Sequence, residues 1–276
     1  MAEAVATTSP AVPARVMQGP ASPRYANRMV LGAIGVFALL VSWELLVALR
    51  LLDPLFSSAP SRVFAAGVRY FAIGSGLEDL LVTVRTFSTG FFSAVLAGIV
   101  LGLLMGWFRP FEALIDPVFN FAYTSPRPAL FPLFVIWFGI GVESKIALVF
   151  VSAIFPVAIG TAVGVKTVDR SLLNVARSFH GSMLQILRTV VLPSSVPHIV
   201  SGIRVALGHG LTAAVFGEMV VANKGLGYSM RVAGNNFDID LVFCGFVVIG
   251  AIGVVAAELL RLVEKRLETW RPDIHR

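Results

Sequence analysis

The sequence predicts an all-α protein that crosses a membrane about six times. Hydrophobic residues make up 57% of its 276 residues and charged residues only 14%, whereas a soluble domain carries about 25% charged residues. The mean hydropathy is +0.83, and the apolar residues form long runs separated by short stretches rich in charge, glycine and proline. A chain this apolar cannot hide its surface from water, so we expect it to lie in a lipid bilayer.

The basic residues point to membrane topology and not to nucleic acid. The net charge is +6 and the isoelectric point is about 10.0, but no soluble domain gathers these charges. In the predicted topology, Lys and Arg near the helix ends are roughly twice as frequent on one side of the membrane as on the other. This excess predicts that both termini lie in the cytoplasm. We expect no nucleic-acid partner. The single cysteine, Cys244, can form no internal disulfide.

The first 80 residues predict a tail, one span and an outer connection. Residues 1–28 are rich in Ala, Pro and Ser and are predicted to be a disordered cytoplasmic tail. Residues 29–49 are apolar for longer than the 7–15 residues or so of a signal peptide, so we expect a retained first span. Residues 52–80 suit an outer connection with a short interfacial helix.

Residues 82–107 form the second predicted span. Gly98, Gly102 and Gly106 recur in it at four-residue spacing, with Ala94 extending the row. Small residues spaced in this way let two helix backbones approach closely inside a membrane. We therefore expect this row to face another helix.

The third predicted span, residues 111–139, is too long for one straight crossing. It is interrupted by Ser125-Pro126-Arg127-Pro128, and because proline lacks a backbone donor the freed carbonyl groups need other partners. The sequence therefore predicts one discontinuous span. Arg127 lies in the break, where it either bonds exposed carbonyl groups or meets an anionic ligand.

The remaining spans are predicted at residues 144–165, 199–222 and 241–263. Residues 223–240 are expected outside, and residues 266–276 are expected to form a charged cytoplasmic tail. Between the fourth and fifth spans, residues 166–198 carry apolar side chains at three- and four-residue steps from Leu172 to Val190, which predicts an amphipathic helical segment. Gly181 should divide it into two short helices, and Pro193 and Pro197 should end it before the fifth span. Periodicity alone fits a helix in the headgroup layer and a partner-docking helix equally well.

This loop resembles the inner loop of permease subunits of ATP-binding-cassette importers. The family pattern is E-A-A, then G about four residues on, then I-x-L-P; Ala176 and Val190-Val191-Leu192-Pro193 match it. Asn174 stands in place of the acidic residue, and His180 in place of the glycine, with Gly181 next to it. Residues 128–161 and 217–230 resemble the nitrate, sulfonate, taurine and pyrimidine-precursor branch of these permeases. The resemblance covers residues 29–265.

The resemblance implies a type I importer permease fold in the bacterial inner membrane, and a path for a small organic anion or related nutrient. It implies three kinds of protein partner: cytoplasmic ATPase subunits, an extracytoplasmic substrate-binding protein and a second, identical permease. The permease itself is expected to be surrounded by membrane lipid. Since the chain has no G-x-x-x-x-G-K-[ST] motif, ATP hydrolysis is expected in a separate chain. The residues that the resemblance assigns to ATPase docking are Asn174, Ala176, Arg177, His180, Gly181, Leu192 and Pro193.

Three residues are candidates for the translocation path: Glu218, Arg127 and His209. Glu218 either lines or gates the path or is a buried structural carboxylate, and His209 also fits simple packing. The sequence has no H-E-x-x-H, no G-x-S-x-G and no Cys/His cluster with metal-ligand spacing. We therefore expect a non-catalytic subunit with no metal and no cofactor.

The competing interpretation is a secondary transporter or channel that works without an ATPase. Such a protein should show inverted repeats around discontinuous helices, and the two halves of this sequence show no convincing repeat.

Overall fold

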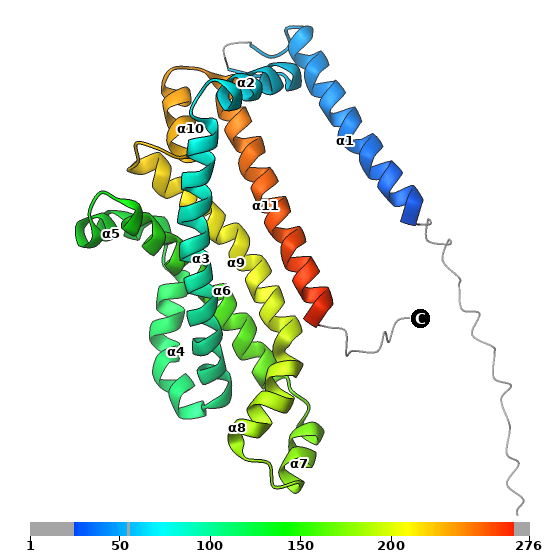
Figure 1. Ribbon diagram of the computed structural model, residues 1–276, viewed down its shortest axis with the longest axis vertical. Helices are drawn as coiled ribbons and strands as arrows, with labels where there is room; N and C mark the ends of the chain where they lie inside the picture. Colours follow the sequence, from blue (N-terminus) through cyan, green and yellow to red (C-terminus); the bar gives the residue numbers. More distant parts are fainter. Residues whose placement is uncertain (1–24, 54–55, 268–276) are drawn as a thin grey trace, which may run out of the picture.

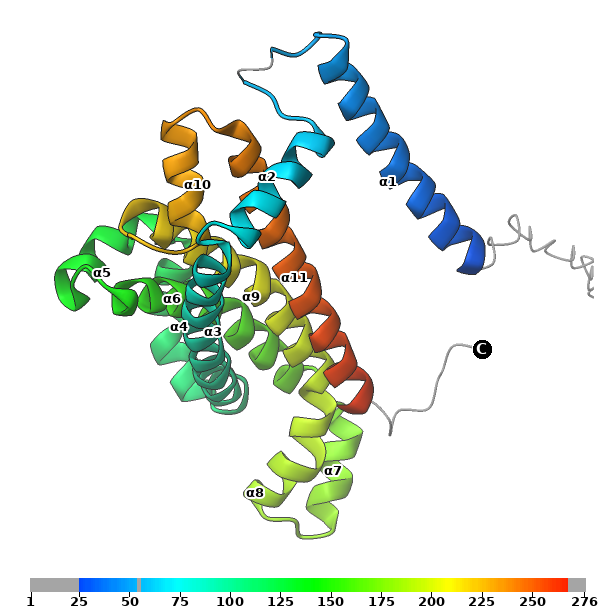
Figure 2. The ribbon, with the colours of Figure 1, turned by 45° about the horizontal axis from the view of Figure 1, so that its top comes forward.

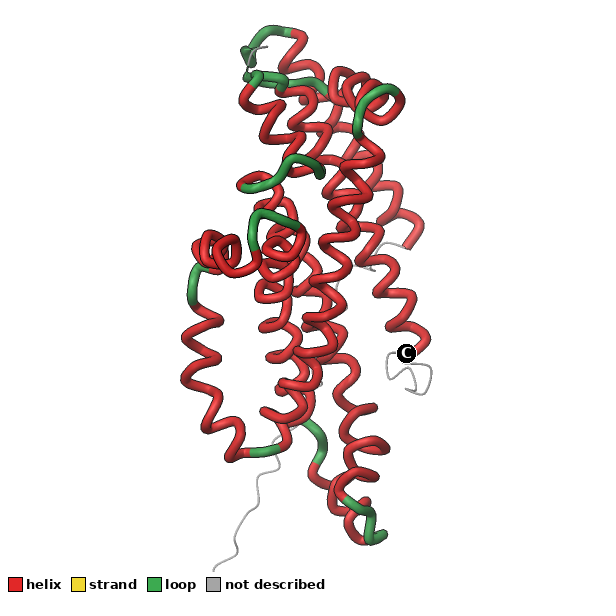
Figure 3. The backbone as a smooth tube through the Cα atoms, turned by 60° about the vertical axis from the view of Figure 1, so that its left-hand side comes forward, coloured by secondary structure: helices red, strands yellow, loops and turns green. Residues whose placement is uncertain are grey.

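The computed structural model describes residues 25–53 and 56–267, and within these ranges it contains helices and no strand (Figure 1). Figure 3 shows that short loops join most of the helices. The all-α prediction is confirmed. The elements in chain order are α1 (Tyr25–Ala48), α2 (Pro60–Ala72), α3 (Gly76–Trp107), α4 (Arg109–Thr124), the 3₁₀ turn η1 (Arg127–Leu130), α5 (Phe131–Phe138), α6 (Val142–Lys166), α7 (Arg170–Ser178), α8 (Met183–Ile186), the π-helical turn η2 (Leu187–Val191), α9 (Leu192–Val220), α10 (Leu226–Asn235) and α11 (Ile239–Leu267).

Five helices of the described chain are long and apolar enough to cross a membrane: α1, α3, α6, α9 (together with α8 and η2) and α11. The segment predicted as a sixth, discontinuous span consists of α4, a break at Ser125 and Pro126, η1 and α5, and its crossing of the membrane stays a prediction. In Figure 1, α4 runs beside the lower half of α3, and α5 turns away from the bundle. Two prolines, Pro126 and Pro128, account for the break because neither can donate a helical hydrogen bond.

The core of the bundle is α6 packed between α3 and α9, the two helices that contact it most extensively. The predicted row of small residues on α3 faces α6: a Cβ added at Gly98 would stand 2.8 Å from the Cβ of Val157, and one at Gly106 would stand 2.6 Å from the Cβ of Val165. On the other side of α6, a Cβ added at Gly160 would stand 2.9 Å from the Cα of Gly202 in α9. The three backbones therefore approach one another at distances that only glycine allows.

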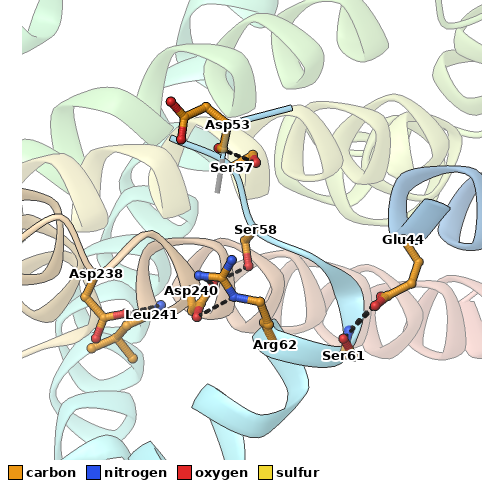
Figure 4. A network of polar contacts seen from close by, with 9 residues as sticks. All are labelled: Glu44, Asp53, Ser57, Ser58, Ser61, Arg62, Asp238, Asp240 and Leu241. Atoms are coloured by element: carbon orange, nitrogen blue, oxygen red, sulfur yellow. Dashed lines mark hydrogen bonds and ion pairs between the residues drawn. The ribbon is translucent and has the colours of Figure 1, made fainter. Parts of the chain in front are cut away.

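One end of the bundle is tied together by polar contacts among α1, α2 and α11 (Figure 4). Asp240 accepts hydrogen bonds from Ser58 Oγ (2.6 Å) and Arg62 Nε (3.1 Å), and Glu44 of α1 accepts bonds from the hydroxyl and amide groups of Ser61. Apart from this end, α1 stands clear of the bundle in Figures 1 and 2, and none of its apolar window is buried. Its surface is therefore free to meet lipid or another chain.

The structure differs from the predicted boundaries in three places. Helix α3 begins at Gly76, six residues before the predicted start at Val82. Helix α10 lies within residues 223–240, where we predicted only an outer connection. The prolines at 193 and 197 do not separate the loop from the fifth span, because α9 begins at Leu192 and continues through both. The chain stays helical from Met183 to Val220, and the π turn at Leu187–Val191, in which the backbone hydrogen bonds reach one residue further, lies directly before Pro193.

Two predicted tails lie largely outside the described residues. Residues 1–24 and 268–276 are not described, and α1 begins at Tyr25 while α11 ends at Leu267.

Gly102→Ala is expected to destabilise the protein, because the added Cβ would stand 2.4 Å from the carbonyl oxygen of Ala158 and a helix backbone cannot rotate away. Overpacking of this kind costs about 1–3 kcal/mol, which should appear as a lower thermal unfolding temperature of the purified protein. Gly250→Ala in α11 is the matched control, since a Cβ there meets nothing within 4 Å. Equal unfolding temperatures for the two variants would contradict the close packing of α3 on α6.

Candidate functional site

The segment between α6 and α9 forms a helical hairpin, residues 167–191, at the end of the bundle opposite α2 and α10 (Figures 1 and 2). It contains α7, a four-residue turn, α8 and η2. Two short helices separated at Gly181 are what the sequence predicts. Figure 1 shows that α7 and α8 project beyond the turn between α3 and α4. The hairpin is therefore a protruding element joined directly to two core helices.

The turn between α7 and α8 is held by a backbone motif that fixes the positions of His180 and Gly181. The amide of Gly181 donates to the carbonyl of Ala176 (3.2 Å), and the amide of His180 donates to the carbonyl of Arg177 (2.9 Å). This pair of bonds is the Schellman helix ending, in which the residue at the position of His180 adopts a left-handed conformation. His180 does so with φ of 55°.

Gly181 is required in this turn for a different reason. Its φ is not positive, but a Cβ there would stand 2.9 Å from the carbonyl oxygen of Ala176. A side chain at position 181 would therefore push the turn away from α7.

Side-chain caps stabilise the starts of both short helices. The carboxylate of Asp169 accepts a hydrogen bond from the amide of Ser171 (2.8 Å), and this bond holds the pKa of Asp169 below its usual value. Ser182 and Gln185 form a reciprocal capping box at α8: the amide of Ser182 donates to Gln185 Oε1 (2.7 Å), and the amide of Gln185 donates to Ser182 Oγ (3.4 Å). These caps stabilise the two helices of the hairpin, although both helices are short.

Burial divides the apolar side chains of the predicted amphipathic segment into two groups. Ile186 and Val191 are buried against Val165 and Val168. Phe179, in contrast, is 82% exposed, and four more large apolar side chains are exposed beside it. These are Leu172, Val175, Met183 and Leu184. The hairpin therefore has an anchored face and an unpartnered apolar face.

The residues predicted to dock an ATPase lie on or near the hairpin. Asn174, Arg177 and His180 are exposed, and Ala176 and Gly181 are half-buried in the turn. Leu192 and Pro193 are half-buried in the first turn of α9. Their role in docking an ATPase stays a prediction.

A second candidate site is a cavity of about 340 Å³ at the break between α4 and α5, lined in addition by α6 and α9. Two of the three residues predicted for a path, Arg127 and His209, line it together with the hydroxyl-bearing residues Ser125, Ser152 and Thr212. The guanidinium of Arg127 donates through Nη2 to the carbonyl of Tyr123 (3.0 Å) and lies 5.2 Å from the Tyr123 ring centroid. Its Nε is buried without a hydrogen-bond partner among the described residues.

Glu218, the third predicted path residue, does not line this cavity. It is completely buried between α3, α9 and α10, where its Oε2 accepts hydrogen bonds from Thr83 Oγ1 (2.8 Å) and from the amide of Gly227 (3.0 Å). This geometry matches the second interpretation of Glu218, a buried carboxylate bonded to its neighbours. Its role in a path stays a prediction.

A polar network that was not predicted from the sequence holds α10 against α3. Asp79 accepts hydrogen bonds from Tyr70, Ser75, Ser229 and the amide of Gly225, all between 2.6 and 2.7 Å. Burial, together with the hydrogen bond to Asp79, raises the pKa of the Tyr70 hydroxyl. The spacing of Asp79 and Thr83, four residues apart on one face of a helix, was a signal that could have revealed this network.

The described residues contain no group of three or more His, Cys, Asp or Glu side chains that could hold a metal ion. The two candidate sites are the hairpin of residues 167–191 at one end of the bundle and the cavity at Arg127 partway along it.

Comparison with known proteins gives concordant matches. Residues 94–269 match the family model described as binding-protein-dependent transport system inner membrane component. The chain is 34% identical over 254 residues to the taurine transport system permease protein of Escherichia coli K12, covering 90% of this chain and 92% of that protein. It is 29% identical over 229 residues to a putative aliphatic sulfonates transport permease protein of Bacillus subtilis 168, covering 83% of each.

Among solved structures, the crystal structure of an amino acid ABC transporter with histidines is similar in fold. The TM-score is 0.60 at 16% sequence identity, covering 74% of this chain and 98% of that one. At this identity the likeness supports the fold alone, which agrees with the predicted importer permease architecture.

Proposed function

Because this chain belongs to the family of binding-protein-dependent transport system inner membrane components, we propose that it carries small organic anions of the sulfonate class. The chain is a permease subunit of an ATP-binding-cassette transporter, a multi-pass membrane component without a catalytic role of its own. Membership of this family implies an ATPase and a substrate-binding protein as partners. A secondary transporter or channel is not the family's mode of action.

The cavity at the broken span is the structural observation that carries the proposal of an anionic substrate. A sulfonate group presents three acceptor oxygens, and Arg127 presents the planar donor fork that suits such a group. Arg127 lines the cavity, and among the described residues its guanidinium makes one hydrogen bond, from Nη2 to the Tyr123 carbonyl, so donors remain for an oxyanion. The hydroxyl groups of Ser152 and Thr212 line the same cavity and can donate to further oxygens. The names of the taurine and sulfonate relatives point to the same chemistry.

Arg127→Gln is expected to reduce uptake of labelled taurine by the reconstituted transporter at least about tenfold, because a hydrogen bond to a charged group contributes about 1.5–3 kcal/mol. Arg127→Lys keeps the positive charge and should retain part of the activity, which separates loss of the anion contact from misfolding. Arg69→Gln, at an exposed position on α2, is the control and should transport like the wild type.

Uptake by Arg127→Gln equal to that of the wild type would remove Arg127 from the path. Preference of the wild-type transporter for uncharged over sulfonated compounds would overturn the proposed substrate class.

We further propose that the hairpin of residues 167–191 docks a cytoplasmic ATPase subunit through its exposed apolar face. A helix that rests in the headgroup layer lies flat with its apolar side in lipid, whereas this hairpin projects past the end of the bundle (Figure 1). Phe179 at the tip is flanked by the exposed Arg177 and His180. An apolar centre with charged neighbours is typical of a protein interface. Since the hairpin continues into α6 and α9, a partner that moves it also moves the core.

Gly181→Val is expected to uncouple ATP hydrolysis from taurine uptake while leaving the amount of protein in the membrane unchanged. The added side chain must displace the turn that carries Phe179 and His180, because the Cβ alone would stand 2.9 Å from the Ala176 carbonyl oxygen. The α3–α6–α9 core is not touched. The measurement is ATPase activity and uptake of the complete transporter in parallel.

Gly250→Val in α11 is the matched control for this test. It adds the same side chain at a position where a Cβ meets nothing within 4 Å. We expect this variant to remain coupled. Coupled uptake by Gly181→Val at the wild-type level would refute the docking role of the hairpin.

We also propose that two copies of this chain form the path, with both termini in the cytoplasm. The excess of Lys and Arg on the side of the termini supports this orientation, and the exposed faces of α4 and α5 leave room for a second copy. Native mass spectrometry of the purified transporter should give two identical permease chains per complex. A cysteine placed at Ser178 should react with a membrane-impermeant thiol reagent only from the cytoplasmic side; a single copy, or labelling from outside, would contradict the assignment.

A further inference from the structure

A second cationic cavity lies at the end of the bundle opposite the hairpin. It has a volume of about 310 Å³ and lies between the start of α6, the end of α9, the following turn and α10. Lys145, Asn223 and Arg231 line it, and none of the described residues that line it is acidic. It shares no lining residue with the Arg127 cavity.

Lys145 is the most informative residue of this cavity. It is only 5% exposed, and its stem packs on α9 close to Gly217. Within the described residues, its ammonium group has no hydrogen bond and no carboxylate within 4.0 Å; Glu218 and Glu143 act on its charge only from a greater distance. A buried cation without a bonded partner is costly, so its retention beside an open cavity calls for a ligand.

Arg231 supplies a second set of unused donors. Its Nη2 donates to the carbonyl of Ala222 (3.0 Å) and its guanidinium lies 5.3 Å from the centroid of the Tyr228 ring, which fixes the side chain in place. Its Nε is buried and has no partner among the described residues. Arg231 is therefore held in position, and one donor is left unsatisfied.

The N-terminus of α6 opens on the same cavity. Gly141 is the N-cap residue and offers no side-chain cap, and both Gly141 and Val142 line the cavity. The first amide groups of this 25-residue helix have no acceptor within the helix, and the same first turn carries Glu143, whose Oε2 would stand 2.6 Å from a Cβ at Gly141. The positive charge of the cavity therefore comes from Lys145, which is buried, and from Arg231, which is half-buried.

We infer that this cavity is a second anion subsite, which holds the oxyanion group of the transported molecule at the end of the permease opposite the ATPase-docking hairpin. The inference rests on the proposed sulfonate function, since it assigns to the same molecule a place separate from the Arg127 cavity. An oxyanion here accepts hydrogen bonds from the ammonium group of Lys145 and from the part of the Arg231 guanidinium that lines the cavity.

The test is binding of methanesulfonate to the purified full-length protein, followed by thermal unfolding and compared with chloride at equal ionic strength. Methanesulfonate should raise the unfolding temperature of the wild type more than chloride does. Lys145→Met keeps the packed stem and removes the charge, so without the anion it should unfold no lower than the wild type. Its half-saturating concentration of methanesulfonate should rise at least about tenfold, and Arg231→Gln should behave likewise.

Lys224→Gln is the matched control, because Lys224 is an exposed cation at the same end of the bundle that pairs with Glu78. It should bind methanesulfonate like the wild type. An equal response from the wild type and the Lys145 and Arg231 variants would overturn the subsite. So would a Lys145→Met protein that is less stable and yet keeps the full anion response, since Lys145 would then serve only the fold.

Measurements of uptake and of methanesulfonate binding together show which of the two proposals is wrong, the subsite or the substrate class. If wild-type transporter takes up no sulfonate while methanesulfonate still binds through Lys145, the substrate class is wrong and the site stands. If taurine uptake depends on Arg127 while the Lys145 and Arg231 variants bind methanesulfonate like the wild type, the subsite is wrong and the proposed function stands.

Discussion

Along α6, the neighbouring helices approach so closely that glycine occupies the main contact positions. Gly98, Gly102 and Gly106 of α3 meet one side of α6, and Gly202 of α9 meets Gly160 on the other. Added side chains would collide with backbone atoms, which cannot move aside as a flexible side chain can. Because lipid tails offer no hydrophobic drive for helix association, close van der Waals packing of this kind is the main force that holds such helices together. The three helices therefore behave as one body.

This constraint connects the two ends of the molecule. The hairpin follows directly on α6 and leads directly into α9, and its anchored face is buried against Val165 near the end of α6. The Arg127 cavity and the Lys145 cavity are both lined by α6 and α9. A displacement of the hairpin is consequently transmitted to both cavities, provided that the core does not yield. If the hairpin docks an ATPase as proposed, this connection is how the ATPase would change access to the two cavities.

Much of this fold was predictable from the sequence because the determining signals are local. Glycine spacing predicted the close face of α3, and the run from Ser125 to Pro128 predicted the break before α5. Helix α10 was missed because it is short and is held by distant partners: its first turns bond Asp79 and Thr83 of α3, a contact that sequence spacing alone does not reveal. The boundary at Pro193 was wrong because the chain stays helical from Met183 to Val220, with a π turn directly before Pro193.

The candidate site was predictable to a similar extent. Arg127 and His209 are far apart in the sequence, yet the structure places both on one cavity. Glu218 was grouped with them on chemistry alone, but it is buried against Thr83 and Gly227 instead. The departure from the family pattern at position 180 also has a structural meaning. The pattern's glycine falls where the helix ending demands a positive φ, and His180 adopts that conformation at a cost in free energy.

Distances between spin labels in the complete transporter test most directly whether the hairpin and the core move together. One label at Ser178 on the hairpin and one at Glu143 near the start of α6, in a chain with Cys244 replaced by serine, report the distance within one copy. Labels at Ser178 in two copies report the distance between hairpins. The account predicts that ATP binding changes the distance between copies and leaves the distance within each copy unchanged. A change within one copy as large as that between copies would contradict it, because the hairpin would then bend without moving the helices that line the cavities.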